Sequence, residues 1–282
     1  MRDTRDAPPV QPVKIAEGRE AEILAWGEGR VLRLFRDPAA AARADREIRA
    51  LAAVRSVLAI VPAPFERIEW QGRPGIVMER VSGRDALTQI ARQPWRLLEL
   101  AALSGRVHAE LNGIVAPAAL PALRAEMGRR IGSDPAIPDD LRAAALDALA
   151  SLPDGTALCH GDFQIANVLL SPSGPVVIDW GNATRGDPAG DFARSLLMTR
   201  LGSLPPGTPP LIRWGRRLGT GLFRQAYQRA YRKRAPHDPT HVHRWALVRA
   251  VERLADGIPE ERARLLREAE RLAGEGRPRR HS

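Results

Sequence analysis

The sequence predicts an α+β fold with two lobes, a small N-terminal lobe built on an antiparallel β-sheet with one helix and a larger, mostly helical C-terminal lobe. Three observations predict this division. Short apolar runs separated by Gly and Pro turns fill residues 13–82. From Trp95 onward, apolar residues recur at helical spacing. Within that helical part, residues 167–180 hold two runs of branched apolar residues around Ser-Pro-Ser-Gly, which indicates a single hairpin.

The chain divides accordingly into two lobes with a short polar segment at each end. We expect the N-terminal lobe at residues 13–82 and the C-terminal lobe at residues 83–273. Residues 1–12 are polar and rich in Pro, and residues 274–282 are rich in Arg, Gly and Pro. We expect both end segments to be disordered, because they offer little apolar surface to bury.

Turn residues and apolar periodicity locate the individual elements. In the N-terminal lobe, strands are expected at 20–26, 30–36, 65–70 and 76–81, with a helix at 38–54. In the C-terminal lobe, helices are expected at 95–112, 138–152, from 192 onward, 210–234, 240–255 and 259–273. Each lobe therefore has enough apolar positions for a core of its own.

Composition places the chain among ordinary globular proteins. It is 44% hydrophobic and 27% charged, and no apolar run approaches the about 20 residues that a membrane helix needs. The N-terminus lacks the apolar region of a signal peptide, so a cytoplasmic protein is expected. The single cysteine, Cys159, excludes internal disulfides and stands in an apolar run. We interpret it as a small buried hydrophobic residue and not as a nucleophile.

The net charge of +10 is concentrated near the C-terminus. From Leu201 to Ser282 there are 18 basic and 8 acidic residues, so this stretch holds the whole excess. A nucleic-acid surface would explain the asymmetry, but no nucleic-acid-binding motif accompanies it. Only two lysines occur in the chain, which indicates a general preference for Arg. A nucleic-acid partner is therefore the less favoured interpretation.

Polar side chains gather around the hairpin at 167–180. Asp162 and Asn167 precede its first strand and Asp179 ends its second, so the three can converge. One carboxylate and one amide suit Mg²⁺, which takes its other ligands from water and substrate phosphates. A further carboxylate can accept the proton of an attacking hydroxyl. Zinc is a poor fit, because His and Cys ligands at the usual spacing are missing.

These residues resemble the catalytic core of the aminoglycoside phosphotransferase and choline kinase-like superfamily, small-molecule relatives of protein kinases. The resemblance rests on His160-Gly161-Asp162, Asn167, Ile178-Asp179-Trp180, Gly186-Asp187-Pro188 and Asp191. It implies a bilobal protein-kinase-like fold that uses ATP and Mg²⁺. Residues 13–82 would then be the nucleotide-binding lobe, and residues 83–273 the catalytic and substrate-binding lobe.

The resemblance also implies a role for each residue of the core. Asp162 would be the catalytic base, Asn167 and Asp179 would hold Mg²⁺, and Asp191 would brace the catalytic loop. We expect His160 to orient this loop through a backbone contact. For Asp187, within Gly186-Asp187-Pro188, we expect a role in fixing a turn and not a contact with substrate.

For the nucleotide, the family pattern is only partly kept. A phosphate-binding lysine of the family is replaced by Arg33, and Glu47 would pair with it. The turn at Gly18 would cover the phosphates, although an ordinary hairpin turn explains it equally well. The main chain of Glu79 and Val81 would contact adenine.

The C-terminal helices wall the acceptor pocket in the family, which makes Trp245 and Arg249 candidates for substrate contact; core packing and surface charge are the alternative. His108 is expected to be a hydrogen-bonded core histidine. The histidines of residues 237–243 suggest metal binding, but Pro239 makes a polar turn between helices the better interpretation.

The sequence therefore predicts an ATP- and Mg²⁺-dependent phosphotransferase acting on a hydroxyl of a small molecule, with no membrane partner. The basic C-terminal part argues against polycationic aminoglycosides and favours a sugar, a nucleoside-like alcohol or an anionic acceptor. The alternative is a non-catalytic, pseudokinase-like nucleotide-binding module, suggested by Arg33 and the weak Gly18 loop.

Overall fold

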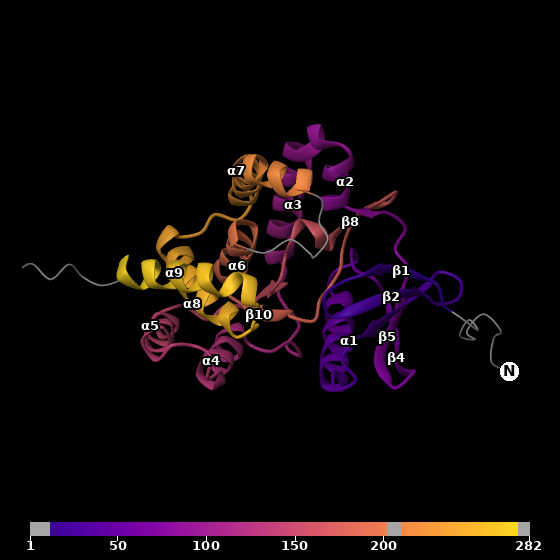
Figure 1. Ribbon diagram of the computed structural model, residues 1–282, viewed down its shortest axis with the longest axis horizontal. Helices are drawn as coiled ribbons and strands as arrows, with labels where there is room; N and C mark the ends of the chain where they lie inside the picture. Colours follow the sequence, from indigo (N-terminus) through magenta and orange to yellow (C-terminus); the bar gives the residue numbers. More distant parts are fainter. Residues whose placement is uncertain (1–11, 202–209, 276–282) are drawn as a thin grey trace, which may run out of the picture. The chain divides into compact units, whose positions relative to one another are not determined.

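The computed structural model describes residues 12–201 and 210–275, with the backbone alone for 201 and 210–218 (Figure 1). Contacts divide these residues into two compact units. The first unit holds the chain up to Thr88 and Ala166–Asn182; the second holds Gln89–Ile165 and the chain from Ala183 onward. The segments expected to be disordered, 1–12 and 274–282, lie almost wholly outside the described residues.

This division differs from the boundary expected after residue 82. Strand β6 (Arg84–Asp85) pairs with β8 (Val168–Ser171), which in turn pairs with β9 (Gly174–Val177). The Val177 N–H also donates to the Ile60 carbonyl over 2.8 Å. Backbone hydrogen bonds thus join the hairpin, expected in the C-terminal lobe, to the N-terminal part of the chain.

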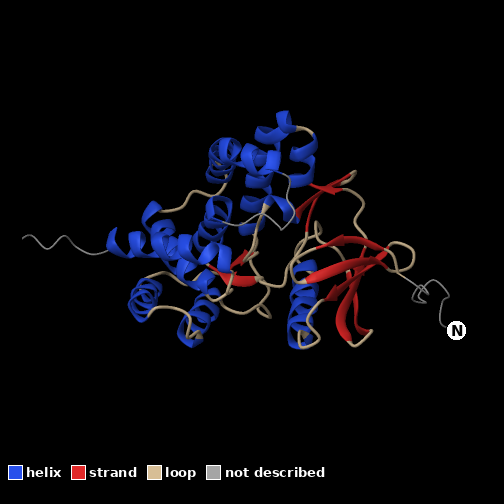
Figure 2. Ribbon diagram, viewed as in Figure 1, coloured by secondary structure: helices blue, strands red, loops and turns tan. Residues whose placement is uncertain are grey.

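The first unit is built on a five-stranded antiparallel sheet in the order β1-β2-β3-β5-β4 (Figure 2). The two expected hairpins, β2–β3 and β4–β5, are both present. Gly27 and Gly29 have φ of 71° and 67°, the left-handed values that the first hairpin turn requires. The strands are β1 (Lys14–Glu17), β2 (Ala21–Ala25), β3 (Arg30–Phe35), β4 (Pro64–Trp70) and β5 (Arg73–Glu79).

Side chains alternate between the two faces of this sheet. Phe35 packs with Ala40 and Ala44 beside helix α1 (Ala41–Arg55), which runs alongside the strands in Figure 1. Leu32 and Leu34 occupy the alternate positions of β3 and belong to a separate cluster with Trp26 and Val77. The odd-numbered positions of β3 therefore face α1, and Arg33 is one of them.

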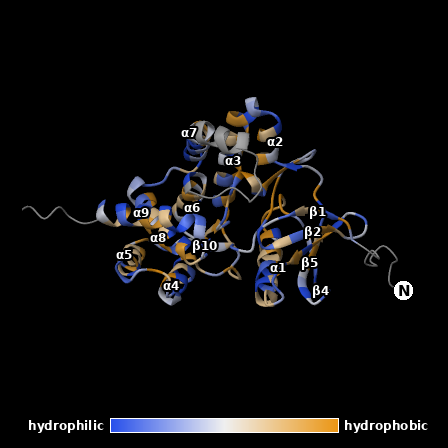
Figure 3. Cartoon of the chain, viewed as in Figure 1, coloured by the Kyte–Doolittle hydropathy of each residue, from blue (hydrophilic) through white to orange (hydrophobic). Residues whose placement is uncertain are grey.

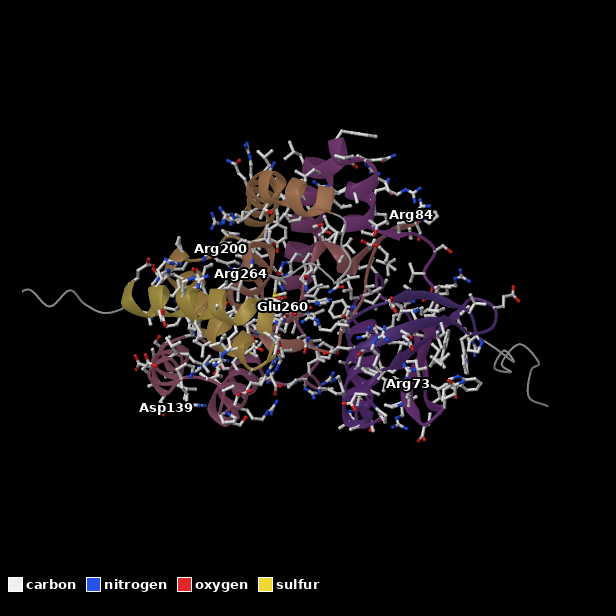
Figure 4. The ribbon with its side chains drawn as sticks, viewed as in Figure 1. Arg73, Arg84, Asp139, Arg200, Glu260 and Arg264 are labelled. Carbon is white, nitrogen blue, oxygen red and sulfur yellow. The ribbon has the colours of Figure 1, made fainter. Side chains whose placement is uncertain are left out.

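Polar side chains also hold this sheet together. Arg73 extends from β5 (Figure 4), donates through Nε to the Phe35 carbonyl over 2.8 Å, and pairs with Glu22 of β2 at 2.8 Å. Because Arg73 bonds to both β2 and β3, it ties together the ends of β2, β3 and β5.

The second unit is mainly helical. Helices α3 and α7 pack closely at Gly105, where a Cβ atom would collide with the Tyr227 carbonyl oxygen. Strands β7 (Ala157–Cys159) and β10 (Thr184–Gly186) form a short antiparallel pair. The helices are α2 (Ala86–Arg92), which leads in from the first unit, α3 (Leu97–Asn112), α4 (Leu123–Ser133), α5 (Asp139–Ala150), α6 (Pro188–Leu201), α7 (Pro210–Arg232), α8 (Pro239–Leu254) and α9 (Pro259–Glu275).

The core of this unit lies among α4, α5, α6, α8 and α9. Trp245 and Ile131 are completely buried in it, and Cys159 has no exposed surface, as expected for a small hydrophobic residue. Helices α5 and α9 carry both hydrophobic and hydrophilic residues along their length (Figure 3). None of the described helices is long and apolar enough to cross a membrane.

Candidate active site

Asp191, in the first turn of α6, is the centre of a buried polar cluster. Its carboxylate has no exposed surface and accepts backbone N–H bonds from His160 at 2.7 Å and Gly161 at 2.8 Å. His108 Nε2 lies 3.0 Å from it, and Asn112 Nδ2 donates to it over 3.1 Å. Asp191 therefore holds the backbone of His160 and Gly161 through two hydrogen bonds.

The charge of Asp191 is stabilised by its neighbours. Burial alone would raise the pKa of this carboxyl, but His108, His160 and Arg249 outweigh burial and hold the pKa well below its ordinary value. His108 is itself held between Asp191 and the Tyr227 hydroxyl, which lies 2.5 Å from Nδ1. The expectation of a hydrogen-bonded core histidine is confirmed.

The loop that Asp191 holds presents Asp162. Gly161 has a φ of 82°, a left-handed backbone conformation that glycine adopts without strain. The Asp162 N–H donates to Nδ1 of the buried His160 over 3.3 Å. Phe163 stacks on the His108 ring with centroids 4.2 Å apart. The Asp162 side chain is 19% exposed, so the carboxylate stands at the edge of a buried, hydrogen-bonded loop.

The side chains of Gln164 and Arg194 lie against the Asp162 carboxylate. Gln164 Nε2 donates to Oδ2 over 2.9 Å, and Arg194 Nε lies 3.8 Å from Oδ1. Sequence reasoning missed both residues. Gln164 could have been noticed for its place two residues after Asp162; nothing local marks Arg194.

The first unit carries a second polar group, made of Arg33, Glu47 and Asp179. Arg33 Nε lies 2.8 Å from Glu47 Oε1, and Arg33 Nη2 lies 3.1 Å from Asp179 Oδ1. The alternation of β3 explains this placement, since Arg33 faces α1, where Glu47 is buried. The expected pairing of Arg33 with Glu47 is present.

Burial acts on the two members of this pair differently. It raises the pKa of Glu47 to about 7, because the cost of desolvation exceeds the attraction of Arg33. Burial alone would lower the pKa of Arg33, but Asp179 and Glu47 more than compensate and raise it. Arg33 is therefore a permanent, partly buried cation.

Asp179 stands just beyond β9 in an unusual backbone conformation. Its φ is 68°, which costs a non-glycine residue free energy and is often found at functional positions. The Ile178 N–H donates to the Asn167 carbonyl over 3.0 Å, which places Asn167 across the hairpin from the residue that precedes Asp179. The hairpin thus brings the backbones of Asn167 and Ile178 together, and the convergence of the Asn167 and Asp179 side chains stays a prediction.

The residues available to a metal ion are oxygen donors. Asp179 and Asn167 offer a carboxylate and an amide, the hard ligands that Mg²⁺ takes when phosphates complete its coordination. Among the described residues there is no cluster of three or more His, Cys, Asp and Glu that could enclose a metal alone. The described residues of the turn at 237–243 form no such cluster either.

Comparison with known proteins identifies the family. The model of the Phosphotransferase enzyme family matches residues 13–237. The chain belongs to this family. Its members share the kinase-like α+β fold that the sequence predicted, and a search of curated protein sequences finds no match.

Solved structures of aminoglycoside phosphotransferases have the same fold. A thermostable mutant of APH(4)-Ia in its apo form is 18% identical, with 94% of each chain covered and a TM-score of 0.64. A ternary complex of a thermostable APH(4)-Ia mutant with ADP and hygromycin B is 18% identical over 95% of each chain, with a TM-score of 0.63. The GDP and kanamycin complex of APH(2")-IIIa is 18% identical, covering 96% of this chain and 94% of the other, with a TM-score of 0.57.

In this phosphotransferase, Asp187 fixes a turn, as expected. Its Oδ1 accepts the Ala189 N–H over 2.9 Å, and its Oδ2 accepts the Trp245 indole N–H over 2.7 Å. Gly190 lies against the indole, where a Cβ atom would approach to 2.9 Å. The Gly-Asp-Pro segment is therefore packed directly on Trp245.

Trp245 and Arg249, the two residues expected to contact the acceptor, are both buried. Trp245 is 0% exposed and Arg249 is 2% exposed, with Arg249 Nε donating to the Gly190 carbonyl over 2.9 Å. The alternative of core packing explains both, because their polar atoms serve the turn that carries Asp187 and Asp191. Neither residue is retained as an acceptor contact.

The local structure gives the residues expected to contact adenine and the phosphates no feature specific to nucleotide binding. The Glu79 N–H already donates to the Ala63 carbonyl over 2.8 Å, so it is engaged within the first unit, and Val81 stays a prediction. Gly18 donates to the Ala21 carbonyl over 2.8 Å without a positive φ, and a Cβ atom there would meet only that oxygen, at 3.8 Å. The turn itself therefore does not require glycine.

Proposed function

We propose that this phosphotransferase transfers the γ-phosphate of ATP to a hydroxyl group of a small molecule, with Asp162 as the catalytic base. The observation that carries the proposal is the loop that presents Asp162. Asp191 holds its backbone through two N–H bonds, and the Asp162 carboxylate stays partly exposed at its edge. A rigid loop that ends in an accessible carboxylate suits a group that must align a hydroxyl.

In the proposed step, Asp162 accepts a hydrogen bond from the acceptor hydroxyl and then its proton. The acceptor oxygen forms a bond to the γ-phosphorus, the bond from that phosphorus to the β–γ bridging oxygen breaks, and ADP leaves with the bonding electron pair. Phosphoryl transfer needs little covalent help from the protein, so orientation by Asp162 is its main contribution.

In the first unit, Arg33 would neutralise the non-transferred phosphates, while Asn167 and Asp179 would hold Mg²⁺. When bound, the ion supplies positive charge that offsets the charge developing on the phosphate oxygens. The pairing of Arg33 with Glu47 supports this role, because it holds the guanidinium in one place. ADP, AMP-PNP and GDP in related structures support a nucleoside triphosphate as the donor.

Replacing Arg33 tests the nucleotide part of the proposal. Arg33→Met should weaken Mg-ADP binding about 10- to 100-fold, since a charge-assisted hydrogen bond contributes about 1.5–3 kcal/mol. Isothermal titration calorimetry measures the affinity. Arg43→Met is the matched control, because Arg43 pairs with Glu20 at the surface, at 3.1 Å, with both side chains exposed. Equal affinity of Arg33→Met and the control would refute a phosphate contact by Arg33.

Neutral or anionic acceptors fit the second unit better than polycations do. Hygromycin B and kanamycin are bound by the related proteins. Here, by contrast, the buried acids of α8 and its neighbours are already paired with arginines: Glu252 with Arg194 at 3.0 Å, and Glu261 with Arg253 at 2.8 Å. Acids neutralised in this way attract an aminoglycoside weakly.

An acceptor panel tests the reaction. ADP release from Mg-ATP should be stimulated by sugars, nucleosides or phosphorylated alcohols and only weakly by kanamycin-like amines, and GTP is compared in parallel. Strong turnover of the amines would contradict the acceptor class.

The need for ATP and the free thiol of Cys159 favour a cytoplasmic site of action.

A non-catalytic nucleotide-binding module is the second candidate. The ion pair between Arg33 and Asp179 favours it, because a guanidinium competes with a metal ion for that carboxylate. This candidate requires Mg-ATP to bind without hydrolysis or transfer to any acceptor in the panel.

A further inference from the structure

A buried network of arginines and acids in the second unit has no role assigned so far in the transfer step itself. It joins α4, α6, α8 and α9, and most of its side chains are nearly inaccessible. Its members are Arg130, Arg194, Arg249, Arg253, Glu252, Asp256 and Glu261.

Two of these arginines hold the same two acids from opposite sides. Arg194 binds Oε2 of Glu252 at 3.0 Å and Oδ2 of Asp256 at 3.3 Å. Arg130 binds the other oxygens, Oε1 of Glu252 at 2.5 Å and Oδ1 of Asp256. Toward these acids, the two arginines have equivalent roles.

Arg194 differs from Arg130 in one contact. Its two terminal nitrogens face the acids, while its Nε faces Asp162 Oδ1 at 3.8 Å. The Arg194 side chain is 4% exposed, so the surrounding core holds it in this orientation. The other carboxylate oxygen of Asp162 accepts from Gln164, so a separate group addresses each oxygen.

Helix α6 controls the loop through two of its residues. Asp191 and Arg194 are three residues apart, so they lie on the same side of the helix. Asp191 binds the backbone N–H groups of His160 and Gly161, and Arg194 reaches the side chain of Asp162. One helix face thus holds both the main chain and the carboxylate of the loop.

The positive charge of Arg194 favours its position beside Asp162. Burial alone would lower the pKa of Arg194, but Glu252, Asp162 and Asp256 outweigh burial and raise it, so the guanidinium stays charged. A cation beside a base weakens that base as a proton acceptor. In phosphoryl transfer this cost is small, because the base mainly orients the nucleophile.

We propose that Arg194 is a positioning residue for Asp162, anchored on Glu252 and Asp256, that turns the carboxylate so that one oxygen is directed to the acceptor hydroxyl. The inference rests on the proposed role of Asp162 as the base. The contact at 3.8 Å is an ion pair that a small movement shortens to a hydrogen bond, as catalytic contacts do once substrate is bound.

The test compares Arg194→Met with Arg130→Met. Both remove one guanidinium from Glu252 and Asp256, and only the first removes one from Asp162. With Mg-ATP and water as the acceptor, ADP release gives kcat and KM. Arg194→Met should lower kcat about 30- to 100-fold with KM for Mg-ATP within about twofold, whereas Arg130→Met should keep kcat within about threefold. Equal losses of kcat would overturn the proposal.

The lysine variants repeat the comparison if a methionine variant does not fold. Arg194→Lys and Arg130→Lys both keep a charge against the acids, but lysine lacks the fork that lets Arg194 serve three carboxylates. Arg194→Lys should lower kcat about tenfold more than Arg130→Lys does. Equal kcat values for the two lysine variants would overturn the proposal.

Melting temperatures test the contact without reference to activity. Asp162→Asn, Arg194→Met or Arg194→Lys, and the corresponding double variant should give shifts that differ from additivity by about 2 to 4 °C. Additive shifts would show that Arg194 does not hold Asp162. If wild type releases no more ADP than Asp162→Asn with water and with every acceptor of the panel, the proposed function fails, and these shifts still decide whether the contact exists.

Discussion

Replacing Asp162 by asparagine should lower kcat for phosphoryl transfer by about 10³-fold. Asparagine has nearly the same shape but carries no charge, so it orients the acceptor hydroxyl more weakly and cannot accept its proton. A positioned base contributes about 10²–10⁴-fold to such reactions. The rest of the loop should be unchanged, because Asp191 holds it through the backbone of His160 and Gly161. We therefore expect the affinity for Mg-ADP to stay within about twofold of wild type.

The measurement is ADP release with the best acceptor of the panel, together with calorimetric binding of Mg-ADP. Asp154→Asn is the matched control, since Asp154 is 81% exposed and pairs with Arg124 at the surface. It should leave kcat unchanged. A kcat of Asp162→Asn within about tenfold of wild type would exclude Asp162 as the base.

Replacing Asp191 by asparagine should destabilise the protein by about 3 to 5 kcal/mol and abolish transfer. The substitution removes a buried charge that His108 and two backbone N–H groups depend on, and it can place an amide donor against those donors. Guanidinium unfolding measures the change. Asp238→Asn is the control, because this exposed residue caps α8 and asparagine caps about as well.

The same carboxylate predicts a pH dependence of stability. The pKa of Asp191 is lower in the folded protein than its ordinary value of 3.8, so its contribution is fully present above about pH 4. The contribution is lost as the pH falls from there toward the folded pKa. The free energy of unfolding should therefore fall less steeply below about pH 4 in Asp191→Asn than in wild type. Equal slopes would show that Asp191 is not the linked group.

Elements with strong local signals could be predicted from the sequence, and elements that depend on burial could not. The hairpins β2–β3 and β8–β9 follow from turn residues between apolar runs. Helix α4 escaped prediction, since Gly128 and Gly132 weaken its helix propensity. It forms because Leu123, Met127 and Ile131, four residues apart, are buried on one face.

The sequence by itself determined the α+β fold class and the residues of the catalytic motif, because turn chemistry, periodicity and motif spacing are local properties. Only the tertiary structure decided which of those residues meet. Arg33 and Asp179 are 146 residues apart in the chain, and Arg194 reaches Asp162 from another element. Trp245 and Arg249 share a helix face that could equally have met solvent, and packing against Gly190 buries them. No local pattern encodes such contacts, because they depend on how whole elements pack against one another.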